Sequence, residues 1–347
     1  MRVRQLAACV LGATMFWQSS ALAFASEKEI PVLTLEKAIE YAKNTSLDLK
    51  IHELNYEVSK ANSKVAKYDG YYAALTPRMN EEYMRKNTTV LENKLTLEVM
   101  NLFDEIILEE ETLALDRRNQ KITEKDIQKA HIELSRGITS EVELQTLKLE
   151  FNQKEKEIQK AEENLAVLYD KLWTMMGTSL KGHVLDKGDS AYTPYRDVPS
   201  INLFATDKAE DHISLWKANE ELNIAMEVPI MSQEYMTVVS KKADREIKDK
   251  EAELTEQNLE QAIKQVYLNV KQIETSYSNA KEDLELQEKQ MKINDIYFEK
   301  GMMSTLEYEK SLLAYEQAQL NLMQLESQHM TLTYQLDHPY LISAAGY

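Results

Sequence analysis

The residue types that most often carry chemistry are present, but not at the spacings that catalysis or metal binding needs. Carboxylates are abundant, as in residues 109–111 and 162–163, but on long helices such runs are usually solvated faces or partners of lysine. Six histidines, none at a His-Glu-x-x-His spacing, are expected in solvent or at packing seams: His52, His131, His183, His212, His329 and His338. The sequence has neither a phosphate-binding glycine loop nor a nucleophile elbow. We therefore expect no enzymatic activity, no cofactor and no metal site.

Two short segments, 164 positions apart, share a pattern that predicts a tight turn between two helices. In each, a glycine can end the incoming helix in the left-handed conformation. A serine three residues later can begin the next helix, with a glutamate after it completing a capping box. Capping explains these residue types, and an exposed turn can also bind a partner. The residues are Arg136, Gly137, Ser140 and Glu143 in the first turn, and Lys300, Gly301, Ser304 and Glu307 in the second.

The first 25 residues have the pattern of an export signal. Arg2 and Arg4 precede an apolar run at residues 6–17, and small residues before position 26 supply a cleavage site. The run is about 12 residues long, whereas a membrane-spanning helix needs roughly 20, so we expect cleavage. Cys9, the only cysteine, would leave with this segment. Disulfides, zinc fingers and cysteine nucleophiles are therefore excluded from the mature chain.

The remaining sequence is acidic and contains no long apolar segment. The chain has 41 lysines and arginines against 58 aspartates and glutamates, a formal net charge of −17. Such a charge disfavours nucleic acids and anionic lipids as partners. No later stretch reaches 18 consecutive apolar residues, so no transmembrane helix is expected.

Glycine and proline divide the sequence into long helical stretches. Both are missing from residues 78–136, 138–176, 230–300 and 302–338. A helix interior disfavours glycine by about 1 kcal/mol and proline by about 3, so these stretches predict long helices. We expect the chain to pause between Gly70 and Thr89, around Pro77, before the first long helix begins. Residues 178–200, which contain two glycines and two prolines, are expected to form a connector.

Apolar residues at spacings of four and three predict that the helix over residues 47–68 packs in a bundle or coiled coil. They are Leu47, Ile51, Leu54, Val58, Ala61, Val65 and Tyr68. The next helix has an apolar face through Leu95 and Leu113, but residues 116–129 are mostly charged. A hollow barrel of helices, with one face lining water, would interrupt the seam in this way. An isolated exposed coiled coil would show the same pattern.

The second half repeats the order of the first. Leu215, Asn219, Leu222 and Met226 follow Leu47, Ile51, Leu54 and Val58 by 168 positions. We predict an all-α fold of duplicated long helical hairpins. Its parts would be the signal (1–25), a first repeat (26–177, turning near 137), the connector (178–200) and a second repeat (201–347, turning near 301).

These features together resemble the TolC family of outer-membrane efflux proteins. Residues 33–39 resemble the family's opening helix, and residues 44–50, echoed at 211–215, resemble its next helix start. The resemblance implies a trimer whose helices form a hollow α-barrel in the periplasm, below an outer-membrane β-barrel. It also implies that both hairpin tips meet a periplasmic adaptor of an inner-membrane pump.

The sequence departs from that family where membrane strands belong. A membrane strand needs about 9–11 residues with alternating apolar side chains. Residues 72–89 are interrupted by charge, and residues 234–239 offer at most one short strand. We therefore expect little or no β-barrel. The predicted function is a channel or conduit in an efflux or type I secretion assembly of the periplasm and outer membrane. The alternative is a non-conducting exported coiled-coil structural or adaptor protein.

Overall fold

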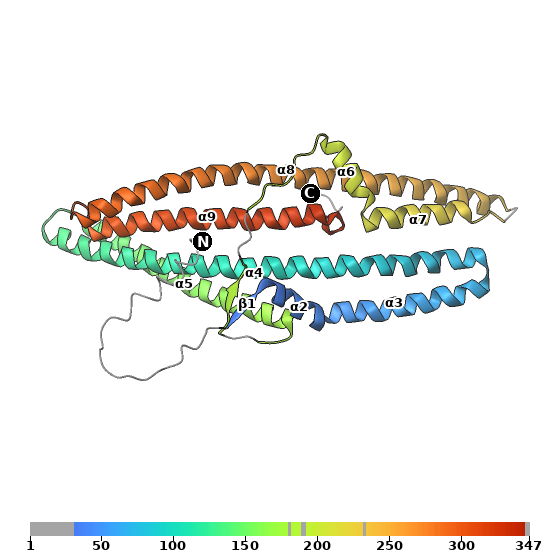
Figure 1. The fold of residues 1–347 in the computed structure, drawn as a ribbon, viewed down its shortest axis with the longest axis horizontal. Coiled ribbons are helices and arrows are strands. Elements are labelled where there is room, and N and C mark those ends of the chain that lie inside the picture. Colours follow the sequence, from blue (N-terminus) through green and yellow to red (C-terminus); the bar gives the residue numbers. More distant parts are fainter. Residues whose placement is uncertain (1–30, 180–181, 189–191, 232–233, 344–347) are drawn as a thin grey trace. The chain divides into compact units, whose positions relative to one another are not determined.

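The computed structural model describes residues 31–179, 182–188, 192–231 and 234–343. The predicted export signal lies outside these residues. The chain from Val32 onward forms one compact unit. In the described residues it is almost entirely helical, which confirms the all-α prediction (Figure 1). The helices are α2 (Leu35–Thr45), α3 (Leu47–Ala66), α4 (Tyr71–Ser135), α5 (Glu141–Met176), α6 (Ile201–Glu210), α7 (Ile213–Glu227), α8 (Tyr235–Glu299) and α9 (Thr305–Asp337), with short 3-10 helices at Lys67–Asp69 and Pro339–Leu341.

Two long hairpins lie side by side and make a layer of helices. One hairpin consists of α4 and α5, the other consists of α8 and α9, and α4 contacts α9 between them. Beyond the reach of α5 and α9, α3 packs on α4, and α7 packs on both α8 and α4. The order across the layer is therefore α5-α4-α9-α8 toward the tips and α3-α4-α7-α8 toward the other end (Figure 1).

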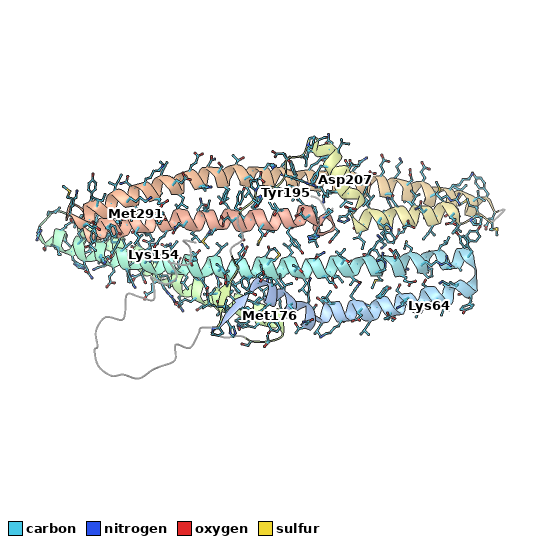
Figure 2. The ribbon with its side chains drawn as sticks, in the orientation of Figure 1. Lys64, Lys154, Met176, Tyr195, Asp207 and Met291 are labelled. Atoms are coloured by element: carbon cyan, nitrogen blue, oxygen red, sulfur yellow. The ribbon has the colours of Figure 1, made fainter. Side chains whose placement is uncertain are left out.

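Each hairpin has its own hydrophobic core in the described residues. The first joins α2, α4 and the end of α5 through residues such as Phe103, Ile106 and Met176. The second joins α6, α7, α8 and the end of α9 through residues such as Leu259, Ile263 and Leu336, with Tyr195 packed against it. Met176 and Tyr195 are labelled in Figure 2. The two clusters share no residue, so apolar burial stabilises the hairpins separately.

The connector is more structured than its composition indicates. Its residues 184–186 form strand β2 (Val184–Asp186), which pairs in parallel with β1 (Val32–Thr34). Val32 lies opposite Val184, and Leu33 lies opposite Leu185. Both of these leucines are buried in the first core. This pair was not predicted, because strands of three residues carry too little alternation to be recognised.

The pause predicted between Gly70 and Thr89 is wrong. Helix α4 begins at Tyr71 and runs through Pro77 without interruption. A proline there removes the hydrogen bond to the carbonyl of Ala73, at a cost of about 3 kcal/mol. Packing offsets this cost, because Ala74 and Met79 on the same segment are buried.

Residues 234–239, which offered at most one short strand, are helical from Tyr235, where α8 begins. The guanidinium of Arg245 donates hydrogen bonds to the carbonyls of Ala225 and Val228, both at 2.8 Å. The last carbonyl groups of a helix have no partner within it, and these two bonds satisfy two of them at the end of α7. The Arg245 contacts thereby hold the first turns of α8, as helix, beside α7.

The apolar seam of α3 is present, but the same chain does not cover it. Helix α3 packs on α4 through the opposite face, where His52, Ser63 and Ala66 are buried. Leu47, Leu54 and Val65 on the seam are 72%, 67% and 63% exposed. A helix at the edge of a layer has only one neighbour, so its second apolar face stays open.

Candidate functional site at the hairpin tips

Both predicted turns end their incoming helix in the same way. Gly137 has φ +71° and Gly301 has φ +67°, the left-handed conformation expected for a glycine after a helix. In the first turn, the Ile138 amide donates to the carbonyl of Glu133 (2.9 Å) and the Gly137 amide to Leu134 (3.0 Å). The second turn repeats both bonds, from Met302 to Tyr297 (2.8 Å) and from Gly301 to Phe298 (3.0 Å). This pair of bonds is the Schellman motif.

The outgoing helices begin with the predicted capping boxes. The Glu143 amide donates to Ser140 Oγ at 3.2 Å, and the Ser140 amide donates to the Glu143 carboxylate at 3.1 Å. Ser304 and Glu307 make the same two bonds, at 3.3 and 3.0 Å. These contacts confirm the capping role expected of the four residues.

The capping carboxylates are held in the charged form. A hydrogen bond from the Thr139 hydroxyl, together with the Ser140 amide, lowers the pKa of Glu143. Hydrogen bonds from the Ser304 hydroxyl and amide lower the pKa of Glu307. Each tip therefore presents a carboxylate that stays ionised and is already fixed in position.

All eight predicted tip residues are exposed, so capping leaves their outer surfaces free. Ile138 and Met302, which directly follow the two glycines, were not among the predicted site residues. They are 68% and 74% exposed, and Val142 beside the first turn is 74% exposed. The sequence does contain a signal for these two residues, because an apolar residue follows the glycine in both copies of the repeated turn. Each tip thus combines a basic residue, a fixed carboxylate and an exposed apolar side chain.

Ion pairs join the two hairpins near the tips. Lys125 on α4 contacts Glu309 on α9 at 2.5 Å, and the neighbouring Asp126 contacts Lys310 at 2.8 Å. Further along, Arg118 pairs with Glu316. Of the eight charged residues at positions 116–129, four pair with neighbouring helices: Arg117 with α5, and Arg118, Lys125 and Asp126 with α9.

The ion pair between Arg118 and Glu316, the farthest of the three from the tips, is the most buried. The side chain of Glu316 is 15% exposed, and its Oε2 is buried without a hydrogen-bond partner. Burial raises the pKa of Glu316, and the guanidinium of Arg118 opposes that shift. Burial likewise raises the pKa of Glu111 on α4.

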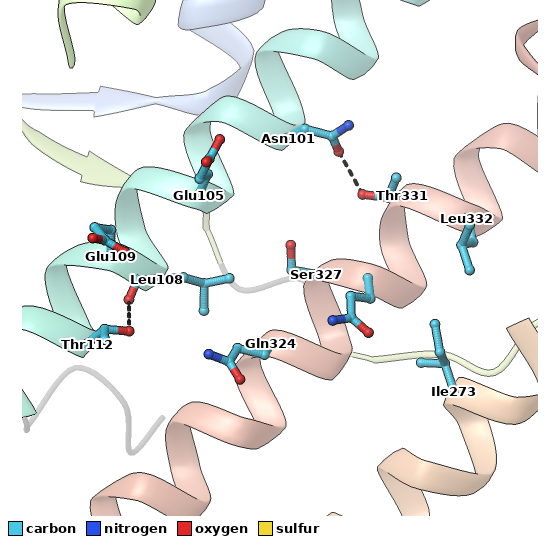
Figure 3. A pocket seen from close by; sticks show the side chains of 11 residues that line it. Asn101, Glu105, Leu108, Glu109, Thr112, Ile273, Gln324, Ser327, Thr331 and Leu332 are labelled. Carbon is cyan, nitrogen blue, oxygen red and sulfur yellow. Dashed lines mark hydrogen bonds between the residues drawn. The ribbon is translucent and has the colours of Figure 1, made fainter. Parts of the chain in front are cut away.

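Between the ion pairs and the hairpin bases, α4 and α9, with Ile273 of α8, line an open groove of about 450 Å³ (Figure 3). A hydrogen bond of 2.7 Å from the Thr331 hydroxyl to the Asn101 amide oxygen crosses one end of it. Most of the lining residues are polar, but apolar atoms make up most of the exposed lining surface. The lining residues are Asn101, Glu105, Leu108, Glu109, Thr112, Ile273, Gln324, Ser327, Gln328, Thr331 and Leu332.

Three of the six histidines are buried in structural positions: His52, His212 and His329. His52 Nε2 donates to the Met84 carbonyl on α4 (2.9 Å) and lies 3.1 Å from the Thr88 hydroxyl oxygen. His212 accepts from the Ser214 amide at the start of α7 and donates to the Ile342 carbonyl at 3.1 Å. Within the described residues, no cluster of three or more histidine, cysteine and acidic side chains could hold a metal ion. None of the described helices is long and apolar enough to cross a membrane.

Comparison with known proteins places this fold among bacterial channels. The chain resembles CusC, studied for transmembrane channel formation, at 12% identity over 95% of this chain and 96% of that one (TM-score 0.63). It resembles the outer membrane protein VceC of Vibrio cholerae at 12% identity, over 89% and 96% of the two chains (TM-score 0.61). It resembles the CmeC outer membrane channel of Campylobacter jejuni at 11% identity, over 97% and 92% (TM-score 0.62).

No protein-family model matches the chain, and no curated protein matches it either. The structural similarity nevertheless extends over nearly the whole chain. The chain has the fold of the TolC-type outer-membrane efflux channels, and the resemblance seen in the sequence is confirmed at the level of fold.

Proposed function

We propose that this protein is the conduit component of an efflux or secretion assembly in the cell envelope. Copies of the chain would associate into a helical tube in the periplasm, near or at the outer membrane. The tube would work by enclosing a passage, and a partner pump in the inner membrane would supply the energy. The observation that carries the proposal is a fold match covering 95% of this chain and 96% of CusC, a protein studied for transmembrane channel formation.

The proposal includes an internal duplication. Helices α4 and α8 each contain 65 residues, and they begin at Tyr71 and Tyr235, 164 positions apart. The tips repeat the same backbone bonds at the same offset. The helices before them follow the order short, medium, long in both halves. Duplication of one hairpin unit accounts for all three correspondences.

The two tips are the proposed docking site for a periplasmic adaptor. Arg136, Gly137, Ser140 and Glu143 would form one contact, and Lys300, Gly301, Ser304 and Glu307 would form the other. Interfaces favour exposed apolar anchors surrounded by polar groups, and Ile138 and Met302 fit that description. An adaptor that bound both tips would need an apolar pocket at each tip. Beside the pocket it would need an acidic group for Arg136 or Lys300 and a basic group for the capping glutamate.

The second candidate is a non-conducting exported coiled-coil structural or adaptor protein. It is favoured by the helical conformation of residues 72–89 and 235–240, the segments in which the family resemblance implies membrane strands. Such a protein would share the fold without forming a passage.

Two measurements separate these functions. Light scattering of residues 26–347, with and without detergent, gives the oligomeric mass, and planar-bilayer recording gives the conductance. A stable oligomer with discrete conductance supports the conduit. A stable oligomer without conductance supports the structural alternative, and a monomer in both solutions contradicts the proposed tube.

A further inference from the structure

The contact between α4 and α9 pairs its polar side chains on both sides of the groove but leaves most of the groove itself unpaired. Toward the tips, Arg118, Lys125 and Asp126 of α4 form ion pairs with α9. Toward the bases, the Tyr334 hydroxyl donates to Asn93 Oδ1 at 3.2 Å. The groove between these contacts therefore departs from the pattern of the rest of the helix pair.

Several polar side chains of the groove have no hydrogen-bond or ion-pair partner among the described residues. Glu105 and Glu109 on α4 are two of them, and Gln324, Ser327 and Gln328 on α9 are the others. Figure 3 shows the two glutamates along one wall and Gln324 and Ser327 along the other. The glutamates are four positions apart, so their carboxylates are neighbours on one face of α4 and repel each other.

Neither wall of the groove supplies a positive charge. Helix α4 has no lysine or arginine from residue 95 to 116, and α9 has none from residue 311 to 337. On α8, the basic residue nearest to Ile273 in sequence is Lys271, which already pairs with Glu274 and Asp197. Just beyond the groove on α9, Glu316 has a buried carboxylate oxygen without a partner. The groove is therefore a region of uncompensated negative charge.

The shape and the apolar surface of the groove narrow the class of cation that fits. It runs along α4 from Asn101 to Thr112, about 16 Å at 1.5 Å per residue. Leu108, Ile273 and Leu332 give it apolar surface, so a ligand that fills it needs methylene groups as well as charge. Residues one helical turn apart have Cβ atoms about 5–6 Å from each other. A linear polyamine has ammonium groups at a comparable spacing, joined by short methylene chains.

We propose that the groove between α4 and α9 binds a linear aliphatic polyamine. Two of its ammonium groups pair with Glu105 and Glu109, and the free amide oxygens of α9 accept hydrogen bonds from its N–H groups. Its methylene groups cover Leu108. A hydrated metal ion gains nothing from that apolar surface, and the described residues contain no cluster of histidine, cysteine and acidic groups that could hold one. The site lies within a single chain, so it goes beyond the proposed conduit and does not depend on it.

Calorimetric titration of residues 26–347 with spermidine tests the site. We expect saturable binding and a urea midpoint that rises with spermidine, because a ligand of the folded state stabilises it. The variant E105Q/E109Q removes both charges and their mutual repulsion, so it should fold at least as stably as the parent and bind about tenfold or more weakly. The matched control E36Q/E40Q changes two exposed glutamates at the same spacing on α2 and should leave binding unchanged.

A steric variant separates binding in the groove from diffuse attraction to an acidic protein. Ser327→Trp fills the groove and keeps every charge, so it should abolish binding, with circular dichroism verifying the fold. Mg²⁺ at the same ionic strength should not displace spermidine, since it makes no use of the apolar surface. Full binding by S327W or by E105Q/E109Q, efficient displacement by Mg²⁺, or no binding to the parent would overturn the site and leave the conduit intact. A monomeric, non-conducting parent that still binds spermidine in this way would overturn the conduit alone.

Discussion

The ion pair between Lys187 and Asp104 is expected to be a main stabilising contact of the first hairpin. Lys187 follows strand β2, and its Nζ lies 2.8 Å from Asp104 Oδ2 on α4. The Asp104 side chain is 3% exposed and Lys187 is 26% exposed. Asp104 Oδ1 is buried without a partner, so among the described residues Lys187 alone supplies a compensating charge in contact with this carboxylate. The pair fastens the two strands onto the long helix.

Lys187→Met keeps most of the aliphatic stem and removes the charge. Removing one partner of a buried pair typically costs about 3–5 kcal/mol, because the other charge stays buried and uncompensated. Since a quarter of Lys187 remains exposed and water reaches it, we expect the lower end, about 3 kcal/mol. In the double variant K187M/D104L no buried charge remains, and most of that loss should be recovered. The control Arg85→Met breaks an exposed pair with Glu82 and should cost under about 1 kcal/mol.

The assay is urea unfolding followed by the fluorescence of Trp173, which lies in the first core. A Trp216→Phe background removes the indole beside Lys86, so the signal reports the first hairpin. A loss below about 1 kcal/mol for K187M, or no recovery in the double variant, would refute the reasoning. Either result would mean that water, and not Lys187, solvates the Asp104 carboxylate.

Other positions yield further predictions. Gly177→Ala should cost at least about 1–2 kcal/mol in chemical denaturation, because the residue is left-handed and its Cβ would lie 2.7 Å from Thr45 Cγ2. Ser140→Ala and Ser304→Ala should each cost about 1 kcal/mol of unfolding free energy, while Ser→Gly should cost only a few tenths, as measured by urea titration. Burial lowers the pKa of His212. The stability linked to this pKa difference is therefore fully present above the pKa of histidine in the unfolded chain, about 6.5. It is lost as the pH falls through the lower pKa that His212 has in the folded protein. A urea midpoint that drops as steeply between pH 7 and 5 in His212→Gln as in the parent would contradict this assignment.

The parts of the fold that local sequence determines were predicted well. The tips depend on a few residues within one turn, so Gly137, Ser140 and their counterparts specified both the caps and the helix ends. Long helices follow from the lack of glycine and proline over tens of residues. Pro77 misled the prediction because its local cost is offset by packing of Ala74 and Met79, which a single sequence does not reveal.

The remaining features depend on distant contacts. The pairing of residues 32–34 with 184–186 brings together segments about 150 positions apart, and three-residue strands contain almost no periodic signal. The charges of α4 were correctly seen to interrupt its apolar seam, but their partners lie on α9, nearly 200 residues away. At the tips, exposure of Ile138 and Met302 follows from how far the hairpins extend beyond their cores.

Separate cores also determine how the hairpins can move. When the contact between α4 and α9 opens, each hairpin keeps its own apolar interior, and water can solvate the released charges. The energetic penalty for relative displacement therefore includes the exchange of polar contacts for hydration and the exposure of the apolar side chains between the helices, such as Leu108 and Leu332. Helix α5 spans about 54 Å at 1.5 Å per residue, so a tilt of about 5° at its base would displace the tip by about 5 Å. Because the long helices are stiff, a small rotation of a hairpin near its core produces a large displacement of the capped turn at its tip.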